Sequence, residues 1–117
     1  MKILFVLNDP PYGTERTYNG LRLALSLLQT AADLELTVFL MGDAVASAKA
    51  GQQTPSGYYN VERMLRGVVT KRGQVLLCGS CMDARGLRDD ELVAGTRRSS
   101  LDQLTEATVR ADKVLVF

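Results

Sequence analysis

The pattern that decides the fold begins with ILFVL at residues 3–7 and stops at NDPPYG, residues 8–13. A continuous apolar run that ends in a Pro- and Gly-containing turn is typical of a strand buried on both faces of a sheet. Apolar residues then recur at helical spacing between positions 18 and 28, which predicts a helix over residues 14–30 with Thr14 as its N-cap. A strand followed by an amphipathic helix is the first half of a parallel β-α-β unit.

The same alternation continues to the last residue. Further strands are predicted at residues 34–40, 74–78 and 114–117, and further helices at residues 44–48, 61–68 and 101–111. Asp43, Asn60 and Ser100 are the expected N-caps of these three helices. Leu101 is expected on the inner face of the final helix, and the final strand is expected to be buried.

Two segments have weaker patterns. Residues 50–59 contain the Gly, Pro and Ser content of an exposed loop, and residues 79–99 predict only a helical turn at 89–92. The predicted fold is therefore α/β, a three-layer sandwich with a parallel sheet and helices on both faces, because right-handed crossovers permit little else.

Length and composition limit the class of protein. At 117 residues the chain has space for one domain, residues 1–117, and its 46% hydrophobic and 23% charged content is that of a soluble globular protein. Fourteen basic and 13 acidic residues give a net charge of +1, so no general attraction to nucleic acid or to an anionic membrane is expected. No apolar stretch approaches the roughly 20 residues that span a bilayer. We expect a cytoplasmic protein with neither a membrane nor a direct nucleic-acid partner.

The chain has two cysteines, Cys78 and Cys81, and no histidine. Without histidine there is no imidazole base, no imidazole-based triad and no common zinc ligand, and two cysteines are too few for a structural zinc site. Residues 8–13 lack the glycine spacing of a dinucleotide-binding loop, and no P-loop lysine motif occurs. We therefore expect no metal and no cofactor.

Reactive groups in open α/β sheets gather beyond the carboxyl ends of the strands, which here selects residues 8–13, 41–43 and 78–86. Both cysteines lie in the third segment. A thiol there can be ionised by backbone N–H groups, with Arg85 as a possible source of positive charge. Three interpretations stay open. Cys78 carries sulfur with Cys81 as a resolving or auxiliary thiol, the pair is a redox dithiol, or Cys78 only packs within a non-catalytic oligomeric binding module.

Several stretches together resemble one known family. They are NDPPYGTE at residues 8–15, LRLALSL at 21–27, VFLMGDAV at 38–45, LCGSCMDARG at 77–86 and ADKVLVF at 111–117. In order, spacing and length they are similar to the DsrE/DsrF-like family, and most similar to its YchN-type branch.

The resemblance implies a small α/β protein that assembles into homohexamers or heterohexamers and takes part in intracellular sulfur transfer. In the sulfur-relay branches a cysteine after the third strand carries a persulfide, and that position corresponds to Cys78. The resemblance thus implies a sulfurtransferase or persulfide carrier, with proteins that donate and accept sulfur as its partners. Cys81 has no required counterpart in carriers with a single cysteine.

Overall fold

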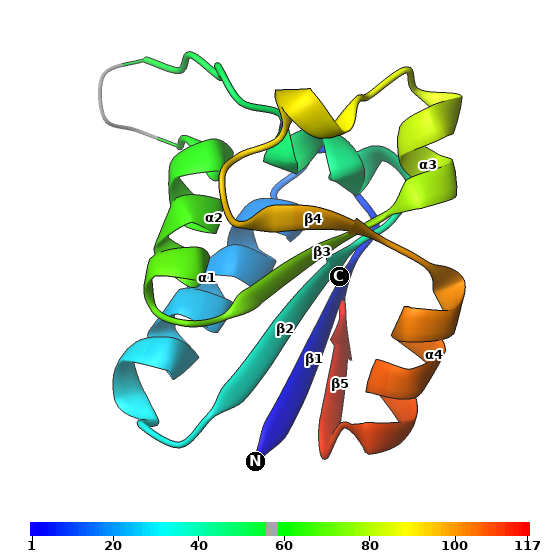
Figure 1. Cartoon of the computed structure of the whole chain (residues 1–117). Coiled ribbons are helices and arrows are strands. Elements are labelled where there is room, and N and C mark those ends of the chain that lie inside the picture. The colour runs from blue at the N-terminus through cyan, green and yellow to red at the C-terminus, as the bar shows by residue number, and fades with distance from the viewer. Residues whose placement is uncertain (56–58) are drawn as a thin grey trace.

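Five parallel strands form one sheet in the order β4-β3-β2-β1-β5 (Figure 1). The computed structural model describes residues 1–55 and 59–117. The strands are β1 (Lys2–Leu7), β2 (Glu35–Leu40), β3 (Gln74–Cys78), β4 (Thr96–Ser99) and β5 (Lys113–Val116). Their carboxyl ends meet at one edge of the sheet, as the sequence pattern predicts.

Helices cover both faces, so the predicted three-layer α/β sandwich is confirmed. Figure 1 shows α1 (Arg16–Thr30) and α2 (Val61–Thr70) on one face and α4 (Leu101–Arg110) on the other. The connections from β1 to β2 and from β2 to β3 run in one direction across the sheet, whereas the β4-to-β5 connection returns, so α4 lies on the opposite face. Three short elements lie near the carboxyl ends of the strands: the 3-10 helices η1 (Gly42–Ala48) and η2 (Asp89–Glu91) and the α-helix α3 (Gly79–Ala84).

The core lies mainly between the sheet and the α1–α2 layer. Side chains that alternate toward this layer are apolar and buried: Ile3, Phe5, Leu7, Leu36, Val38, Leu40, Val75 and Leu77. Gly20 of α1 lets the helix approach β1, because a Cβ at this position would lie 2.8 Å from a methyl group of Leu7. The helix α1 and the strand β1 therefore pack in direct contact at this position.

The α4 face is less completely covered. Leu104, Ala107 and Ala111 pack against the core, but Val114 and Val116 of β5 are 40% and 66% exposed. The final strand is present where predicted, but its predicted burial is wrong for the single chain because β5 is an edge strand outside the cover of α4. Leu101 is also exposed, contrary to expectation.

Two of the four expected N-caps are confirmed. The side chain of Asn60 accepts a hydrogen bond from the Arg63 N–H, and that of Ser100 accepts one from the Gln103 N–H. The Thr14 cap is wrong, because α1 begins at Arg16 and the Thr14 hydroxyl donates to Asp9 instead. The Asp43 cap is wrong, because η1 begins at Gly42 and has no side-chain cap hydrogen bond.

Residues 79–99 contain more structure than the sequence predicts. The turn expected at 89–92 is present as η2, but α3 and β4 were not expected. α3 is only six residues long, and β4 has the polar sequence TRRS at the sheet edge, so neither has a recognisable periodicity. Within the predicted loop at 50–59, residues 56–58 lie outside the described residues. None of the described helices has both the length and the hydropathy to cross a bilayer.

Candidate functional site

Cys78 lies where β3 ends and α3 begins. It is the last residue of the strand and the N-cap of the helix, and its Sγ accepts a hydrogen bond from the Cys81 N–H at 3.4 Å. The Ser80 Oγ lies 3.3 Å from the same sulfur. The residue is 7% exposed. The local chain thus folds back on the thiol and surrounds it with hydrogen-bond donors.

The pKa of the Cys78 thiol reflects two opposing effects. Burial opposes ionisation, but hydrogen bonds from the Cys81 thiol, the Ser80 hydroxyl and the backbone N–H groups of residues 80 and 81 outweigh it. The pKa is therefore lowered, and Cys78 ionises more readily than an ordinary cysteine thiol.

Cys81 has the opposite tendency. Burial and its hydrogen bond to Cys78 raise the pKa of the Cys81 thiol, while the Gly42 N–H and the charge of Arg85 act to lower it without prevailing. The two thiols share one environment, yet Cys78 is the one that ionises first.

Arg85 is held beside Cys81. Its Nε donates to an Asp43 carboxylate oxygen at 2.9 Å, and its Nη1 donates to the Cys81 carbonyl at 3.1 Å. This contact joins α3 to η1, so part of the guanidinium's hydrogen-bonding capacity is used structurally. The sequence placed Arg85 near the site but did not indicate Asp43 as its partner.

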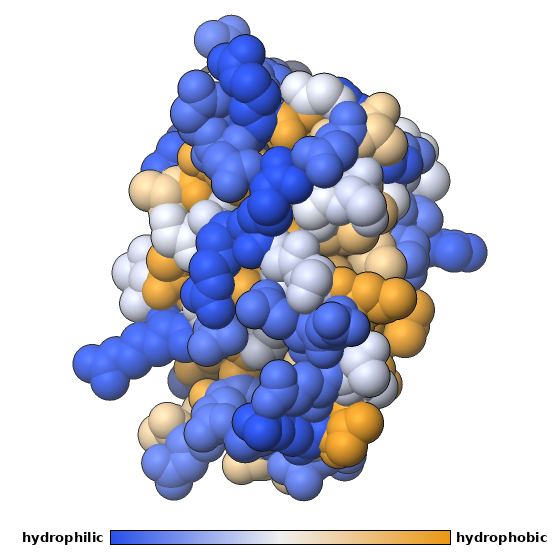
Figure 2. All heavy atoms as spheres, turned by 45° about the vertical axis from the view of Figure 1, so that its right-hand side comes forward, coloured by the Kyte–Doolittle hydropathy of each residue, from blue (hydrophilic) through white to orange (hydrophobic). Residues whose placement is uncertain are grey.

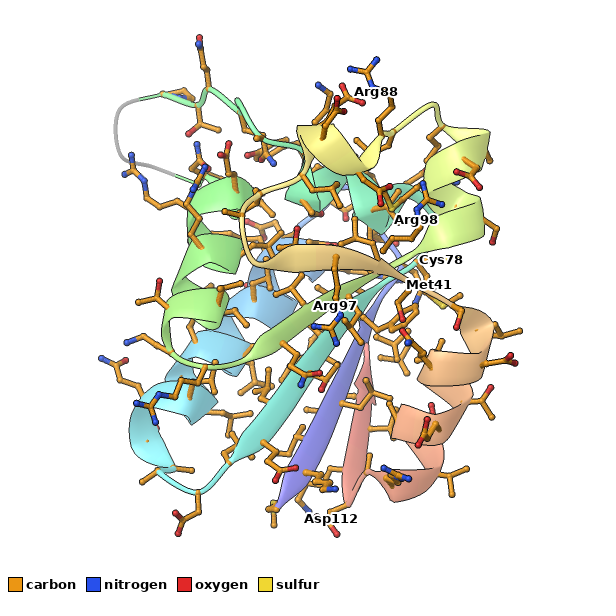
Figure 3. All side chains as sticks on the ribbon, in the orientation of Figure 1. Met41, Cys78, Arg88, Arg97, Arg98 and Asp112 are labelled. Carbon is orange, nitrogen blue, oxygen red and sulfur yellow. The ribbon has the colours of Figure 1, made fainter. Side chains whose placement is uncertain are left out.

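Arg98 and Gly79 position α3. The sequence placed Gly79 in the segment after β3 without giving it a role, and it did not select Arg98 for the site. Arg98 Nη1 donates to the Gly79 carbonyl and to Asp83 of α3, and its Nε donates to Asp89 of η2. A Cβ at Gly79 would lie 3.0 Å from the Ser99 carbonyl oxygen and 3.1 Å from Arg98, so this position accepts only glycine without a shift. Figure 3 shows Arg98 close to α3 and Cys78.

The second strand-end segment lies next to the cysteines, whereas much of the first faces elsewhere. Figure 3 shows Met41 beside Cys78 at the carboxyl edge of the sheet. Gly42, the next residue, has a φ of +55°, a left-handed conformation that glycine adopts without strain. In residues 8–13, by contrast, the Tyr12 hydroxyl donates to Gln52 and accepts from the Val61 N–H, so it holds the segment around residue 52 against α2.

Both cysteines lie at this edge of the sheet, Cys78 at the end of β3 and Cys81 in the first turn of α3. Across residues 1–55 and 59–117, no three side chains of the types His, Cys, Asp or Glu form a group that could hold a metal ion. The thiols of Cys78 and Cys81 are the nucleophiles that the described residues place at this edge.

A family model described as the DsrE/DsrF-like family matches residues 1–117. The chain belongs to the DsrE/DsrF-like family. It is 40% identical to Protein YchN of Escherichia coli over 99% of this chain and 98% of that protein. The crystal structure of the E. coli ychN protein superposes with a TM-score of 0.94, over 99% of this chain and 98% of that one.

More distant relatives of this DsrE/DsrF-like protein also match end to end. An uncharacterized protein of Methanocaldococcus jannaschii is 32% identical, with both chains fully covered. Sulfurtransferase TusD of Salmonella typhi is 26% identical, again with both chains fully covered. The resemblance to the family, and to its YchN-type members, is thereby confirmed.

Proposed function

We propose that this protein carries sulfane sulfur as a persulfide on Cys78 and passes it between donor and acceptor thiols in a cytoplasmic sulfur relay. The observation that carries the proposal is the set of hydrogen-bond donors around Sγ of Cys78 at the end of β3, which act to lower the pKa of its thiol. A thiolate is the nucleophilic form of cysteine, so a thiol that ionises readily attacks a donor persulfide without an external base.

The transfer needs only sulfur chemistry. The Cys78 thiolate attacks the outer sulfur of a donor persulfide, the donor S–S bond breaks, and the donor thiolate leaves while Cys78 holds the outer sulfur. The reverse attack by an acceptor thiolate on that outer sulfur restores Cys78. Every step exchanges one S–S bond for another, so neither histidine nor a metal ion is required.

Relatedness supports the same role. TusD, which matches this chain end to end, is named a sulfurtransferase. The family membership and the presence of a cysteine after β3 make a sulfur-relay role the most economical function for this site.

We further propose that the chain works as an oligomer, with a hexamer as the expected form. Figure 2 shows the side of the molecule that carries α4, where hydrophobic patches interrupt a hydrophilic surface. The exposed large apolar side chains of this layer are Leu101, Val109, Val114 and Val116. Contact between copies would bury this surface, and each Å² of apolar area removed from water would stabilise the assembly by about 25 cal/mol. A monomer mass from light scattering at micromolar concentration would contradict this part of the proposal.

Incubation with a persulfide donor, followed by intact-mass measurement, tests the carrier role. We expect wild type to gain sulfur, Cys78→Ser to gain none, and the matched variant Cys81→Ser to gain sulfur at Cys78. Equal loading of the two single variants would overturn the assignment of Cys78.

The alternative of a non-catalytic binding module makes a different prediction for the same residue. With 7% of its surface exposed, Cys78 of such a module would react slowly with an alkylating reagent until the protein unfolds. A carrier thiol must react in the folded protein, because its partners meet it there. The ratio of alkylation rates in native and denaturing buffer therefore separates the two functions.

A further inference from the structure

A second thiol lies against the proposed carrier. The Cys81 N–H donates to Sγ of Cys78, with 3.4 Å between nitrogen and sulfur, and the Cys81 thiol acts to lower the pKa of Cys78. Cys78 caps α3 and Cys81 occupies its first turn. Residues three apart on a helix have Cβ atoms about 5–6 Å apart, against roughly 3.5–4.5 Å in a disulfide, so a small movement would join the two sulfurs.

We propose that Cys81 discharges the Cys78 persulfide within the same chain, releasing sulfide and leaving a Cys78–Cys81 disulfide. This inference rests on the proposed carrier function and extends it to the release step. Sulfur that is not taken by an acceptor protein then leaves as hydrosulfide.

The step balances without an external oxidant. Sγ of Cys81 attacks Sγ of Cys78, the bond between Sγ of Cys78 and the outer sulfur breaks, and the outer sulfur leaves with the bonding electron pair. The proton of the Cys81 thiol goes to the departing sulfur. The sulfane sulfur is reduced to hydrosulfide, and the two cysteines are oxidised to a disulfide.

The surroundings of Cys81 favour a sequence in which Cys78 is loaded first and Cys81 attacks afterwards. Before loading, Cys81 keeps its proton, because burial and its hydrogen bond to Cys78 raise the pKa of its thiol, so it does not compete for the donor. After loading, the negative charge lies on the outer sulfur and the Cys81 proton can pass to it. The Gly42 N–H and the Arg85 guanidinium, both of which favour the Cys81 anion, then stabilise the attacking thiolate.

Cys81 is placed to attack the inner sulfur rather than the outer one. The Cys81 N–H donates to Sγ of Cys78, so the backbone holds residue 81 against the atom that becomes the inner sulfur of the persulfide. Attack there expels sulfide, whereas attack on the outer sulfur would only move the persulfide from one cysteine to the other. Recovery of the dithiol then consumes two equivalents of a thiol reductant, which are oxidised to their own disulfide.

The test loads the full-length protein with inorganic polysulfide, removes the donor by desalting, and follows three quantities without added thiol. These are the sulfide released, the persulfide on the protein, and the internal disulfide, measured by mass after alkylation. We expect wild type to release sulfide faster than Cys81→Ser by a factor of roughly ten or more. One disulfide should form for each sulfide released. Cys81→Ala is the second variant, and both variants should retain the persulfide on Cys78.

The outcomes separate this inference from the carrier function. If wild type neither takes up sulfur nor releases sulfide, and neither position-81 variant loads Cys78, the carrier function fails and the inference fails with it. If these variants load and wild type keeps its persulfide equally long, or carries it on Cys81 without releasing sulfide, only the inference is overturned. Because the ratio of disulfide to sulfide is measured on wild type alone, the test holds even if a variant does not fold.

Discussion

The two faces of the sheet differ in how completely the chain covers them. The face toward α1 and α2 is lined by buried apolar side chains, among them Phe5, Val38 and Leu77. The face toward α4 buries Leu4 and Phe39, but it also carries Gln74 and Arg97 on the strands, both exposed to solvent. Grooves of about 470 and 240 Å³ lie between this face and α4.

Cys78 belongs to the less covered face. Side chains alternate along a strand, so Cys78 points to the same side of β3 as Leu76, whose register partner on β4 is Arg97. The exposed valines of β5 are on this side as well, because Val114 pairs with Leu4, a residue of the α4 face. One face thus supplies most of the packing that stabilises the chain, and the other holds the thiol and the surfaces open to partners.

Truncation of Phe5 should have the largest effect, and it tests the first half of this comparison. Phe5 is fully buried and stacks on Phe117, with ring centroids 5.9 Å apart. We expect Phe5→Ala to lower the free energy of unfolding by about 3–5 kcal/mol, because it leaves a cavity in a filled layer. Chemical denaturation at fixed protein concentration measures this change in the free energy of unfolding.

Val116→Ala on the exposed side of β5 is the matched control. Its side chain is 66% exposed, so its truncation should change the free energy of unfolding of the dissociated chain by less than about 1 kcal/mol. Equal losses in the two variants would mean that the faces do not differ in stability as proposed.

The sequence predicted the well-packed face better than the open one. Residues 3–7 and 75–78 are apolar runs because nearly all of their side chains are buried, on both sides of the sheet, and such runs are recognisable in a single sequence. Thr96–Ser99 has no such run, since an edge strand needs only backbone pairing on one side, and so β4 was missed. The exposure of Val116 depends on how far α4 extends over the sheet. This is a tertiary property, and the local sequence pattern does not predict it.

The site shows a similar division. The position of Cys78 followed from the strand-end rule and its nearness to Cys81 from the spacing of the two residues. The Ser80 hydroxyl at Cys78 and the turn of Arg85 toward Asp43 depend on side-chain rotamers and on η1 packing against α3. These are tertiary features, so the sequence could suggest the chemistry at this edge but not which groups control the ionisation of each thiol.

A charge introduced on α4 should weaken assembly if the less covered face, on the α4 side of the sheet, is the contact between copies. Val109 is 81% exposed, and Val109→Asp should leave the fold intact while weakening self-association by roughly tenfold, because a carboxylate is costly to bury at an apolar contact. Light scattering over a concentration series gives the assembly state. Leu23→Asp, an exposed leucine on α1, is the control that should assemble normally, and weakening by Leu23→Asp alone would move the contact to the other layer.

Removal of the Ser80 hydroxyl should have the smallest effect, and it tests whether the donors around the thiol set its reactivity. The hydroxyl lies 3.3 Å from Sγ of Cys78 and acts to lower its pKa, so Ser80→Ala should raise that pKa and shift the pH dependence of alkylation upward. Loss of a hydrogen bond of about 1 kcal/mol reduces the thiolate fraction, and with it the alkylation rate below the midpoint, about fivefold. The measurement is made in the Cys81→Ser background so that only Cys78 reacts. Ser26→Ala on α1 is the control and should leave the profile unchanged. If Ser80→Ala also leaves it unchanged, the ionisation of Cys78 is governed by the backbone N–H groups and residue 81 alone, and the hydroxyl has no part in activating the thiol.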